Sequence, residues 1–451
     1  MKTSIALLFL AAALTGAASL FSKPSAEQTI RLHIDVDRGV LPAGSVERAV
    51  VKIGLDCLRM PPRELRPPVN LALVIDRSGS MGGDKIAHAR EAALELVSRL
   101  APDDVISLIA FDTSVQTLVH AQRVGDARNL QSAICSIEAG GNTALYGGVV
   151  SGAAEVRRHI EDNRYVNRVI LLSDGLANVG PGSPEELGRL GNSLMKEGIS
   201  VTTIGLGLGF NEDLMTRLAQ RSDGNTYFVE NSSDLPGIFS RELGDVLNVV
   251  ARRVVIEVVF PEGVRPVNFV GREGFIHGQK AELTLNQLYG GQEKFALIEV
   301  EVASDEAGAE REIASATVRY EDAFTQRSAS VTARRNVSFS SEHRVVVASA
   351  DHKVQADYAS NLLAVAKDEA IKLVDDGKKS EAAALLRQRS AELKEMGETY
   401  RNTAVAASAA AAAPEAARLE RDGLDNAQRK SYRTDAQQVK NQQSSSGSVR
   451  P

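Results

Sequence analysis

Two patterns of apolar residues divide this chain into unlike regions. Between residue 69 and about residue 250, short runs rich in Ile, Val and Leu alternate with segments in which apolar residues recur at helical spacing. The apolar runs are Val69–Ile75, Val105–Phe111, Val169–Ser173 and Val201–Leu206. Short uninterrupted runs of this kind are typical of parallel strands that helices cover on both faces. We therefore predict an α/β domain with a doubly wound, mostly parallel sheet.

Strands without helical partners flank this region on both sides. Before it, Thr29–Asp37 and Val46–Leu55 alternate between apolar and polar residues. After it, five more strands are predicted: Arg253–Phe260, Ala281–Leu285, Phe295–Val302, Ala314–Tyr320 and Ser328–Ala333. The two early strands are expected to complete a β-sandwich with the later ones, so that the α/β domain is an insertion in the sandwich.

The remainder of the chain has helical spacing and then loses its apolar pattern. Tyr358–Val374 and Ser380–Met396 are predicted to form a helical hairpin, and Ala404–Ala413 an Ala-rich helix that ends at Pro414. From about Glu420 the chain is polar and rich in Gln and Ser, which predicts disorder. The expected organisation is a signal peptide (1–18), early sandwich strands (19–66), the α/β domain (67–250), the later sandwich strands (251–345), the helical hairpin (346–400) and the Ala-rich helix with a disordered tail (401–451).

The N-terminus indicates export. Lys2 precedes the apolar run Ile5–Leu14, and small residues follow as far as Ser19, which is the pattern of a secretory signal with cleavage expected after Ala18. The run is shorter than the roughly 20 apolar residues of a membrane helix. No later segment has the length and apolarity of a span, so the mature protein is expected to be periplasmic or extracellular without a transmembrane segment.

Composition narrows the choice of partners. The 451 residues carry a net charge of -6, with no Trp and 4% aromatic residues, which argues against nucleic acid as a ligand. Whether the two cysteines, Cys57 and Cys135, pair is left open by the sequence. The favoured interpretation is that both cysteines are small, buried hydrophobic side chains.

The candidate chemistry lies where the predicted strands end. The segment Asp76-Arg-Ser-Gly-Ser-Met81 follows the first apolar run and places one carboxylate and the hydroxyls of Ser78 and Ser80 in one turn. Thr143 lies in a Gly-rich segment, and Asp174 directly follows another predicted strand. Each feature alone is common in turns and helix caps, but hard oxygen ligands on neighbouring loops suit Mg²⁺ or Mn²⁺.

Together these residues resemble the metal-ion-dependent adhesion site of a von Willebrand factor A domain, with all five ligand positions filled. The segments at Asp76–Met81 and Thr203–Asp213 are similar to bacterial exported members of that family, which resemble inter-alpha-trypsin-inhibitor heavy chains and calcium-activated chloride-channel regulators. The resemblance implies that Asp76, Ser78, Ser80, Thr143 and Asp174 hold one divalent ion. It also implies that an open position on the ion captures an Asp or Glu side chain of a protein partner, as in adhesion or assembly.

Two other functions stay open. The protein is alternatively a structural envelope or matrix component in which the metal only stabilises the loops, or a metal-dependent hydrolase. Hydrolysis is disfavoured because Ser78 and Ser80 have no base nearby in sequence and no catalytic constellation is evident, so the expectation is a protein that is not an enzyme. The glycines of Gly205–Gly209 lack the spacing of a dinucleotide-binding loop and are predicted to form a turn packed against the sheet.

Overall fold

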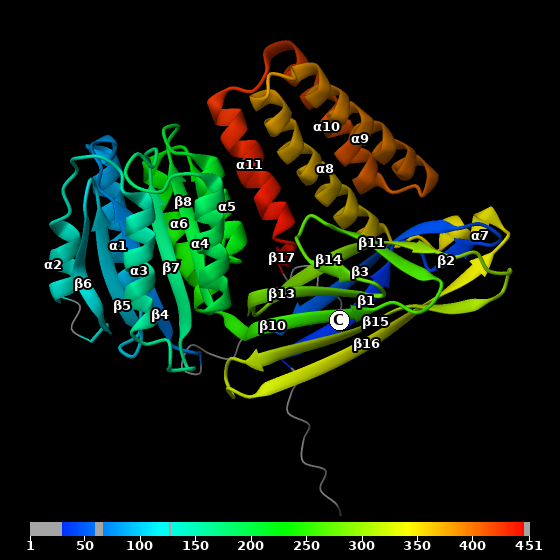
Figure 1. Ribbon diagram of the computed structural model, residues 1–451, viewed down its shortest axis with the longest axis horizontal. Helices are drawn as coiled ribbons and strands as arrows, with labels where there is room; N and C mark the ends of the chain where they lie inside the picture. Colours follow the sequence, from blue (N-terminus) through cyan, green and yellow to red (C-terminus); the bar gives the residue numbers. More distant parts are fainter. Residues whose placement is uncertain (1–28, 59–65, 126–127, 446–451) are drawn as a thin grey trace, which may run out of the picture.

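The computed structural model describes residues 29–58, 66–125 and 128–445. Figure 1 shows three parts side by side: an α/β domain, a β-sandwich, and a group of C-terminal helices above the sandwich. The α/β domain lies at one end of the molecule, and helix α11 stands between it and the other C-terminal helices. The predicted fold class is confirmed.

The α/β domain contains one six-stranded sheet in the order β6-β5-β4-β7-β8-β9. Its strands are β4 (Val69–Asp76), β5 (Val105–Phe111), β6 (Val115–Arg123), β7 (Val166–Ser173), β8 (Ile199–Leu206) and β9 (Thr226–Val229). All neighbours pair in parallel except β5 and β6, which are antiparallel. Every residue of β4, β5 and β8 is buried, as expected when helices cover both faces of a sheet.

Helices on the two faces give this domain two separate cores. The helices are α1 (Asp84–Ser98), α2 (Arg128–Cys135), α3 (Leu145–Arg157), α4 (Pro184–Lys196), α5 (Glu212–Arg221) and α6 (Leu235–Val246). Apolar side chains of α1, α2 and α6 pack on one face, and those of α3, α4 and α5 pack on the other. The loops at the carboxyl edge of the sheet are therefore held by helices on both sides.

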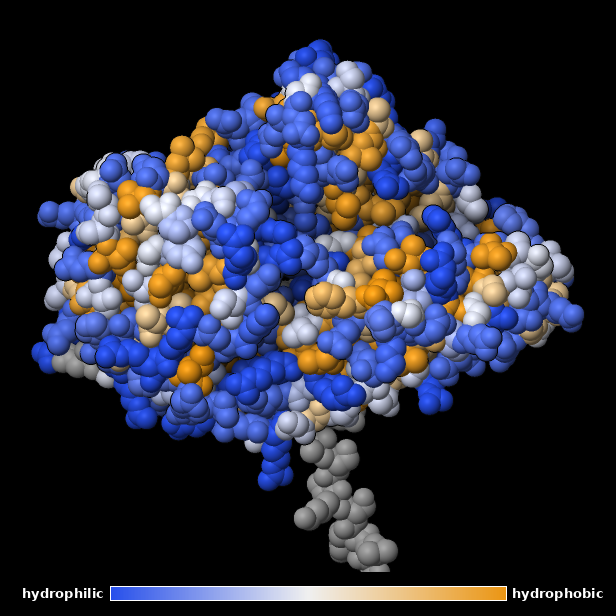
Figure 2. All heavy atoms as spheres, in the orientation of Figure 1, coloured by the Kyte–Doolittle hydropathy of each residue, from blue (hydrophilic) through white to orange (hydrophobic). Residues whose placement is uncertain are grey.

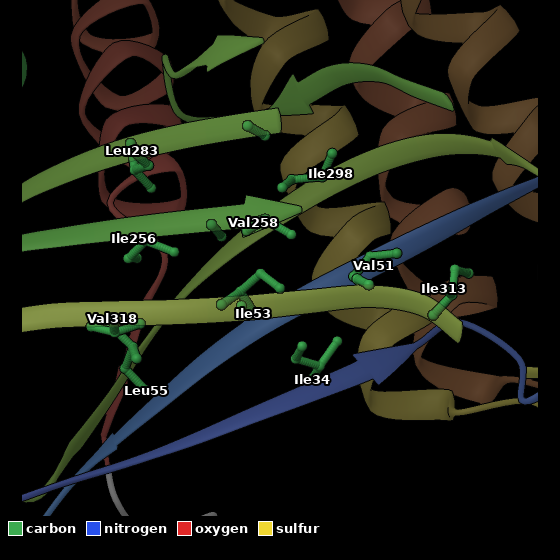
Figure 3. Packing of buried hydrophobic residues seen from close by; sticks show 14 of the residues in the cluster. Ile34, Val51, Ile53, Leu55, Ile256, Val258, Leu283, Ile298, Ile313 and Val318 are labelled. Atoms are coloured by element: carbon green, nitrogen blue, oxygen red, sulfur yellow. The ribbon is translucent and has the colours of Figure 1, made fainter. Parts of the chain in front are cut away.

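The sandwich joins strands from both sides of the α/β domain in sequence. One sheet has the order β1-β3-β14-β11, and the other has the order β12-β13-β10-β15-β16-β2. The strands are β1 (Ile30–Val36), β2 (Val40–Pro42), β3 (Glu47–Cys57), β10 (Val249–Val259), β11 (Val264–Val270), β12 (Phe275–His277), β13 (Lys280–Tyr289), β14 (Gln292–Val302), β15 (Glu310–Asp322) and β16 (Ser328–Ser340). Figure 3 shows Val51, Ile53 and Leu55 of β3 facing Ile256 and Val318 of the other sheet.

Helices follow the sandwich as far as residue 440. They are α7 (His343–Ala348), α8 (His352–Asp375), α9 (Lys379–Thr399), α10 (Thr403–Asp422) and α11 (Asn426–Lys440). Val354 of α8 packs on the outer face of the first sandwich sheet, against Val50 and Leu297. The prediction that the Ala-rich helix ends at Pro414 is wrong. Helix α10 contains Pro414 and continues to Asp422.

The prediction of a disordered tail is wrong for residues up to 445. Helix α11 is followed by strand β17 (Gln443–Ser445), which pairs with β14. Basic side chains of α11 bind carboxylates at the start of α5: Lys430 Nζ is 2.5 Å from Glu212 Oε2, and Arg433 Nη2 is 2.7 Å from Asp213 Oδ1. Several charged side chains of the tail form buried ion pairs. A polar sequence alone does not distinguish such paired side chains from side chains that are exposed to solvent.

The cysteines do not pair. Both are free thiols, and Cys57 is buried in β3 whereas Cys135 is exposed at the end of α2. The favoured interpretation is therefore right for the first cysteine and wrong for the second. Burial raises the pKa of the Cys57 thiol to about 12.

The surface mixes polar and apolar residues. Figure 2 shows hydrophilic and hydrophobic side chains intermingled on the visible face, with a hollow where the α/β domain, the sandwich and α11 meet. A cavity of about 510 Å³ lies at this junction, lined among others by Arg221, Phe275 and Gln437. Over the described residues, none of the helices combines the length and apolarity needed to cross a membrane. The predicted signal peptide, residues 1–18, lies outside the described residues.

Candidate metal site

The five predicted ligands lie on three loops at the carboxyl edge of the parallel sheet. Asp76 is the last residue of β4, and the short helix η2 (Gly79–Met81) follows it and contains Ser80. Thr143 lies two residues before the start of α3, and Asp174 directly follows β7. Strands β4 and β7 are neighbours in the sheet, so their ends bring the first and third loops together.

Hydrogen bonds link the residues of the first loop to one another and to Asp174. The backbone N–H of Ser78 donates to Asp76 Oδ1 at 2.7 Å, which closes the turn after the strand. The Ser78 and Ser80 hydroxyls are 3.1 Å apart, and Ser80 Oγ donates to Asp174 Oδ1 at 2.6 Å. Four of the five predicted ligands are thus joined in one chain of contacts.

Thr143 joins the cluster beside Gly175. A Cβ atom at position 175 would lie 2.7 Å from Thr143 Oγ1 and 3.5 Å from Asp76 Oδ2. Thr143 Oγ1 therefore occupies space that a side chain at residue 175 would take, and Asp76 Oδ2 lies in van der Waals contact with that same space. Asn178 fixes the backbone of this loop, since its Oδ1 accepts the Thr143 N–H at 2.8 Å. The structure brings together all five residues that the sequence singled out.

The two carboxylates are buried, whereas one of the hydroxyls is open to solvent. Asp76 is 0% exposed and Asp174 is 1% exposed, whereas Ser80 is exposed. Burial raises the pKa of Asp76 to about 6; the hydrogen bonds from Ser173 and Ser78 oppose this shift, and the charge of Asp174 adds to it. An ionised Asp76 is therefore costly to hold without a cation nearby.

Two contacts of the cluster were not foreseen from the sequence. Ser173 Oγ donates to Asp76 Oδ2 at 2.5 Å. Lys85, on the first turn of α1, forms an ion pair with Asp174 Oδ2 and donates to the Ser80 carbonyl oxygen at 3.3 Å. The one sequence signal nearby is the pair of glycines before α1, of which Gly83 has a φ of 73° that favours glycine.

The donor set fits a hard divalent cation. Two buried carboxylates and three hydroxyls converge, and oxygen donors of this kind are what Mg²⁺ and Mn²⁺ prefer. The negative charge of Asp76 and Asp174 exceeds that of the single lysine paired with them. The residues present can therefore hold such an ion, with Lys85 as a cation already at one carboxylate oxygen.

The loop after β8 borders the site and carries exposed apolar side chains. A Cβ at Gly209 would lie 2.8 Å from the Asp174 carbonyl oxygen, and one at Gly205 would lie 2.3 Å from the Phe210 ring. The prediction of a closely packed glycine turn is thereby confirmed. Between these glycines Leu208 is 49% exposed, and Leu176 on the third loop is 58% exposed.

Fold and site together define a doubly wound α/β domain with an oxygen-rich cluster at the carboxyl edge of its sheet. The family model of the von Willebrand factor type A domain matches residues 70–241. This part of the chain belongs to the von Willebrand factor type A family.

The curated relatives resemble this chain over about half of its length. It is 30% identical over 268 residues to an uncharacterized protein of Synechocystis sp., which covers 57% of this chain and 62% of that protein. It is 28% identical over 206 residues to human inter-alpha-trypsin inhibitor heavy chain H3, over 43% of this chain and 22% of the heavy chain. The chain thus spans between about a fifth and three fifths of these relatives, and the resemblance to the heavy chains is confirmed.

Solved structures share the fold well beyond the matched domain. A von Willebrand factor type A protein from Catenulispora acidiphila has a TM-score of 0.63 at 16% identity, covering 82% of this chain and 89% of that one. The ArnB paralog VWA2 from Sulfolobus acidocaldarius has a TM-score of 0.60 at 16% identity, covering 91% and 98%. The combination of α/β domain, sandwich and helices is therefore shared with these proteins.

Proposed function

We propose that this protein is an exported module that binds a protein partner through a divalent ion, Mg²⁺ or Mn²⁺. Asp76, Ser78, Ser80, Thr143 and Asp174 would hold the ion, which supplies a positively charged position for an Asp or Glu side chain of the partner. The observation that carries the proposal is the convergence of two buried carboxylates and three hydroxyls at the loop edge of the sheet.

The surroundings of the cluster support a protein as the ligand. Ser80 is exposed, so the cluster can be reached from solvent. Leu176 and Leu208 are exposed apolar side chains on the two loops beside Asp174. The buried core of a protein interface is more apolar than the rest of the surface, so exposed leucines beside the cluster suit contact with a protein partner.

Binding is favoured over hydrolysis on the contacts of the cluster. Within the described residues, the side-chain hydrogen bonds of the five residues involve one another, Ser173, backbone groups and Lys85, and none involves a histidine. Hydrolysis at a metal needs a base or a metal-bound water held for attack. The ion is therefore proposed as an anchor for a carboxylate.

Export rests on the pattern of residues 1–18. A charged start, a short apolar core and a small-residue exit favour a cleaved signal. Mass spectrometry of the N-terminus of the native protein tests this directly. An intact Met1 in a cytoplasmic fraction would contradict it.

The central test is calorimetric titration of the full chain with Mg²⁺. The Asp76→Ala variant should lose binding, because it removes one of two charged ligands. Asp162→Ala is the control, since this half-buried carboxylate is paired with Arg164 before β7, at the other end of the strand from Asp174, and its loss should leave the affinity unchanged. Equal affinity in wild type and Asp76→Ala would rule the site out.

A pull-down from the native envelope separates partner capture from a purely structural role. Capture should be lost in EDTA and in Asp76→Ala, and it should persist in Asp162→Ala. A protein set retained equally under all these conditions would favour the alternative in which the metal only stabilises the loops.

A further inference from the structure

A second group of potential metal ligands lies on the sandwich, outside the von Willebrand factor type A domain. His33 on β1, Asp56 on β3 and Glu293 on β14 come from three adjacent strands. His33 Nε2 is 3.7 Å from Asp56 Oδ2 and 3.7 Å from Glu293 Oε1. One ligand atom from each residue lies within 4.8 Å of the other two.

The group is on the outer face of its sheet. Ile53 and Leu55 alternate with Gly54 and Asp56 along β3, and their side chains point into the sandwich core (Figure 3). The residues between them must face the other way. This outer face is partly open there, because the side chains of His33 and Asp56 are 28% and 17% exposed.

Gly54 allows the His33 ring to reach across β3. His33 and Gly54 are directly opposite each other in the β1–β3 ladder. A Cβ at position 54 would lie 2.1 Å from His33 Cε1 and 2.3 Å from Nε2. Any side chain there would push the ring away from Glu293, which is two strands distant. Glycine weakens a strand and often marks a close approach, and here the group that approaches is an imidazole set between two carboxylates.

The charges of the group leave an excess of negative charge. Asp56 and Glu293 are directly opposite partners in the β3–β14 ladder, an arrangement that destabilises a sheet when both are ionised. The ion pairs around them join four carboxylates to two lysines and to His33: Asp35, Asp56, Glu293, Asp357, Lys52 and Lys353. With neutral His33, the described residues of this network carry two more negative charges than positive ones.

The orientation of His33 is that of a metal ligand with its supporting carboxylate. Its Nδ1 is 2.8 Å from Asp35 Oδ2, which holds Nε2 toward Asp56 and Glu293. Metal-bound histidines usually donate their other N–H to such a carboxylate. The carboxylates of Asp56 and Glu293 on either side of Nε2 therefore favour a cation at this position.

We propose that His33 Nε2, Asp56 and Glu293 form a second metal site, for Zn²⁺ or a similar transition ion. Imidazole with carboxylates suits such ions, whereas the all-oxygen cluster of the α/β domain suits Mg²⁺. Ligands about 2.1 Å from a tetrahedral Zn²⁺ lie about 3.4 Å apart, so the two distances of 3.7 Å need to shorten by only a few tenths of an ångström. Solvent can fill the fourth position.

The lysines can accommodate the ion. Lys52 Nζ is 2.7 Å from Glu293 Oε1 and 2.6 Å from Asp357 Oδ2, and Lys353 Nζ is 2.5 Å from Glu293 Oε2. When Oε1 binds a metal, Lys52 keeps Asp357, and Lys353 keeps the other oxygen of Glu293.

The test is titration of the full chain with Zn²⁺, and with Co²⁺ followed by its visible absorption. Both are carried out in the Asp76→Ala background and, separately, in wild type saturated with Mg²⁺. His33→Asn should weaken Zn²⁺ binding at least tenfold and abolish the tetrahedral Co²⁺ bands. His120→Asn is the matched control, because His120 Nδ1 also lies beside a carboxylate, 2.9 Å from Glu155 Oε1, yet belongs to no such cluster in the part of the chain that the structure describes.

Gly54→Ala separates geometry from composition. It retains all three ligands but occupies the space of the His33 ring, so it should weaken Zn²⁺ binding as much as His33→Asn does. A circular-dichroism spectrum and thermal unfolding of each variant show that the sandwich is intact.

The outcomes are decisive and independent of the proposed function. Unchanged Zn²⁺ affinity in His33→Asn, or absence of Zn²⁺ binding by both starting proteins, overturns the proposal and assigns His33 as the counter-cation of the carboxylates. Mg²⁺ binding should be equal in wild type and His33→Asn, so a failure of the loop site leaves this result unaffected.

Discussion

The two ends of the parallel sheet both bury charge, but only one neutralises it within the chain. At the carboxyl end, Asp76 and Asp174 are buried, and Lys85 is the cation paired with them among the described residues. At the amino end, Arg168 on β7 and Glu242 on α6 are both 0% exposed and lie 3.6 Å apart. The carboxyl end therefore has an excess of negative charge beside surface loops. The ion pair at the amino end leaves no such excess.

Hydrogen bonds complete the network at the amino end. The Arg168 guanidinium donates to Gln287 Oε1 at 2.8 Å and Tyr289 OH at 2.5 Å, both on the sandwich. Glu242 accepts from Thr202 Oγ1 at 2.5 Å and from Tyr227 OH at 3.1 Å. At the amino end, the buried charges are paired with each other, and their network joins two parts of the protein. At the carboxyl end, the excess of negative charge lies at exposed loops and favours a cation from outside.

Breaking the amino-end network should give the largest effect. Arg168→Ala leaves Glu242 buried without its cation, and removing one partner of a buried ion pair costs about 3–5 kcal/mol. Denaturant unfolding measures this loss. Arg157→Ala, which removes an exposed pair with Glu197, should cost less than about 1 kcal/mol. Similar losses in the two variants would show that the amino-end network is not what holds the parts together.

Neutralising a carboxylate at the other end should affect stability only when metal is present. In EDTA, Asp76→Asn should be at least as stable as wild type, because it removes a buried charge next to Asp174. Saturating wild type with Mg²⁺ at a hundred times its dissociation constant should add about 2.7 kcal/mol to the unfolding free energy, and Asp76→Asn should gain nothing. Thermal unfolding with and without Mg²⁺ measures both. A variant stabilised as much as wild type would contradict the proposed site.

This contrast also explains what the sequence could predict. The carboxyl end is readable because its ligands follow strand ends in short motifs, and Asp76-Arg-Ser-Gly-Ser-Met81 is contiguous. The amino-end network joins Arg168 to Gln287 and Tyr289, more than a hundred residues away. No local pattern marks such partners, so the network was not foreseen.

Strand β6 and helix α11 were not predicted from the sequence for the same reason. The antiparallel edge strand β6 mixes polar and apolar residues and buries none of them fully, so its pattern does not predict a strand. Helix α11 is held in place partly by ion pairs of Lys430 and Arg433 with carboxylates at the start of α5, more than two hundred residues earlier. Apolar periodicity predicts elements that bury apolar faces; it does not predict elements held by distant charges.

The pH dependence of stability should distinguish the two ends further. Burial lowers the pKa of Lys294 at the amino-end interface to about 8, against 10.5 for an unperturbed lysine. Between these values the unfolded chain binds more protons than the folded one, so this contribution to stability rises with pH. From pH 7.5 to 10, wild type should gain about 2 kcal/mol relative to Lys294→Met. Denaturant unfolding at each pH measures the difference, and parallel curves for the two proteins would show that the buried lysine does not titrate there.

The smallest expected effect concerns the one cation already present at the carboxyl end. The Lys85 ammonium is paired with Asp174 Oδ2. A positive charge in contact with this carboxylate repels an incoming cation and satisfies an oxygen that the cation would otherwise use. Lys85→Met should therefore bind Mg²⁺ about tenfold more tightly, equivalent to about 1.4 kcal/mol.

Lys85→Arg keeps the positive charge and should bind Mg²⁺ with close to wild-type affinity, which separates charge from side-chain shape. In EDTA, Lys85→Met should be less stable than wild type because buried Asp174 loses its partner. Mg²⁺ should remove this difference in stability. Calorimetric titration of the three proteins measures the affinities. Weaker Mg²⁺ binding by Lys85→Met would mean that the lysine helps to build the ion site. The carboxyl end would then resemble the amino end, with its charges organised by the chain itself.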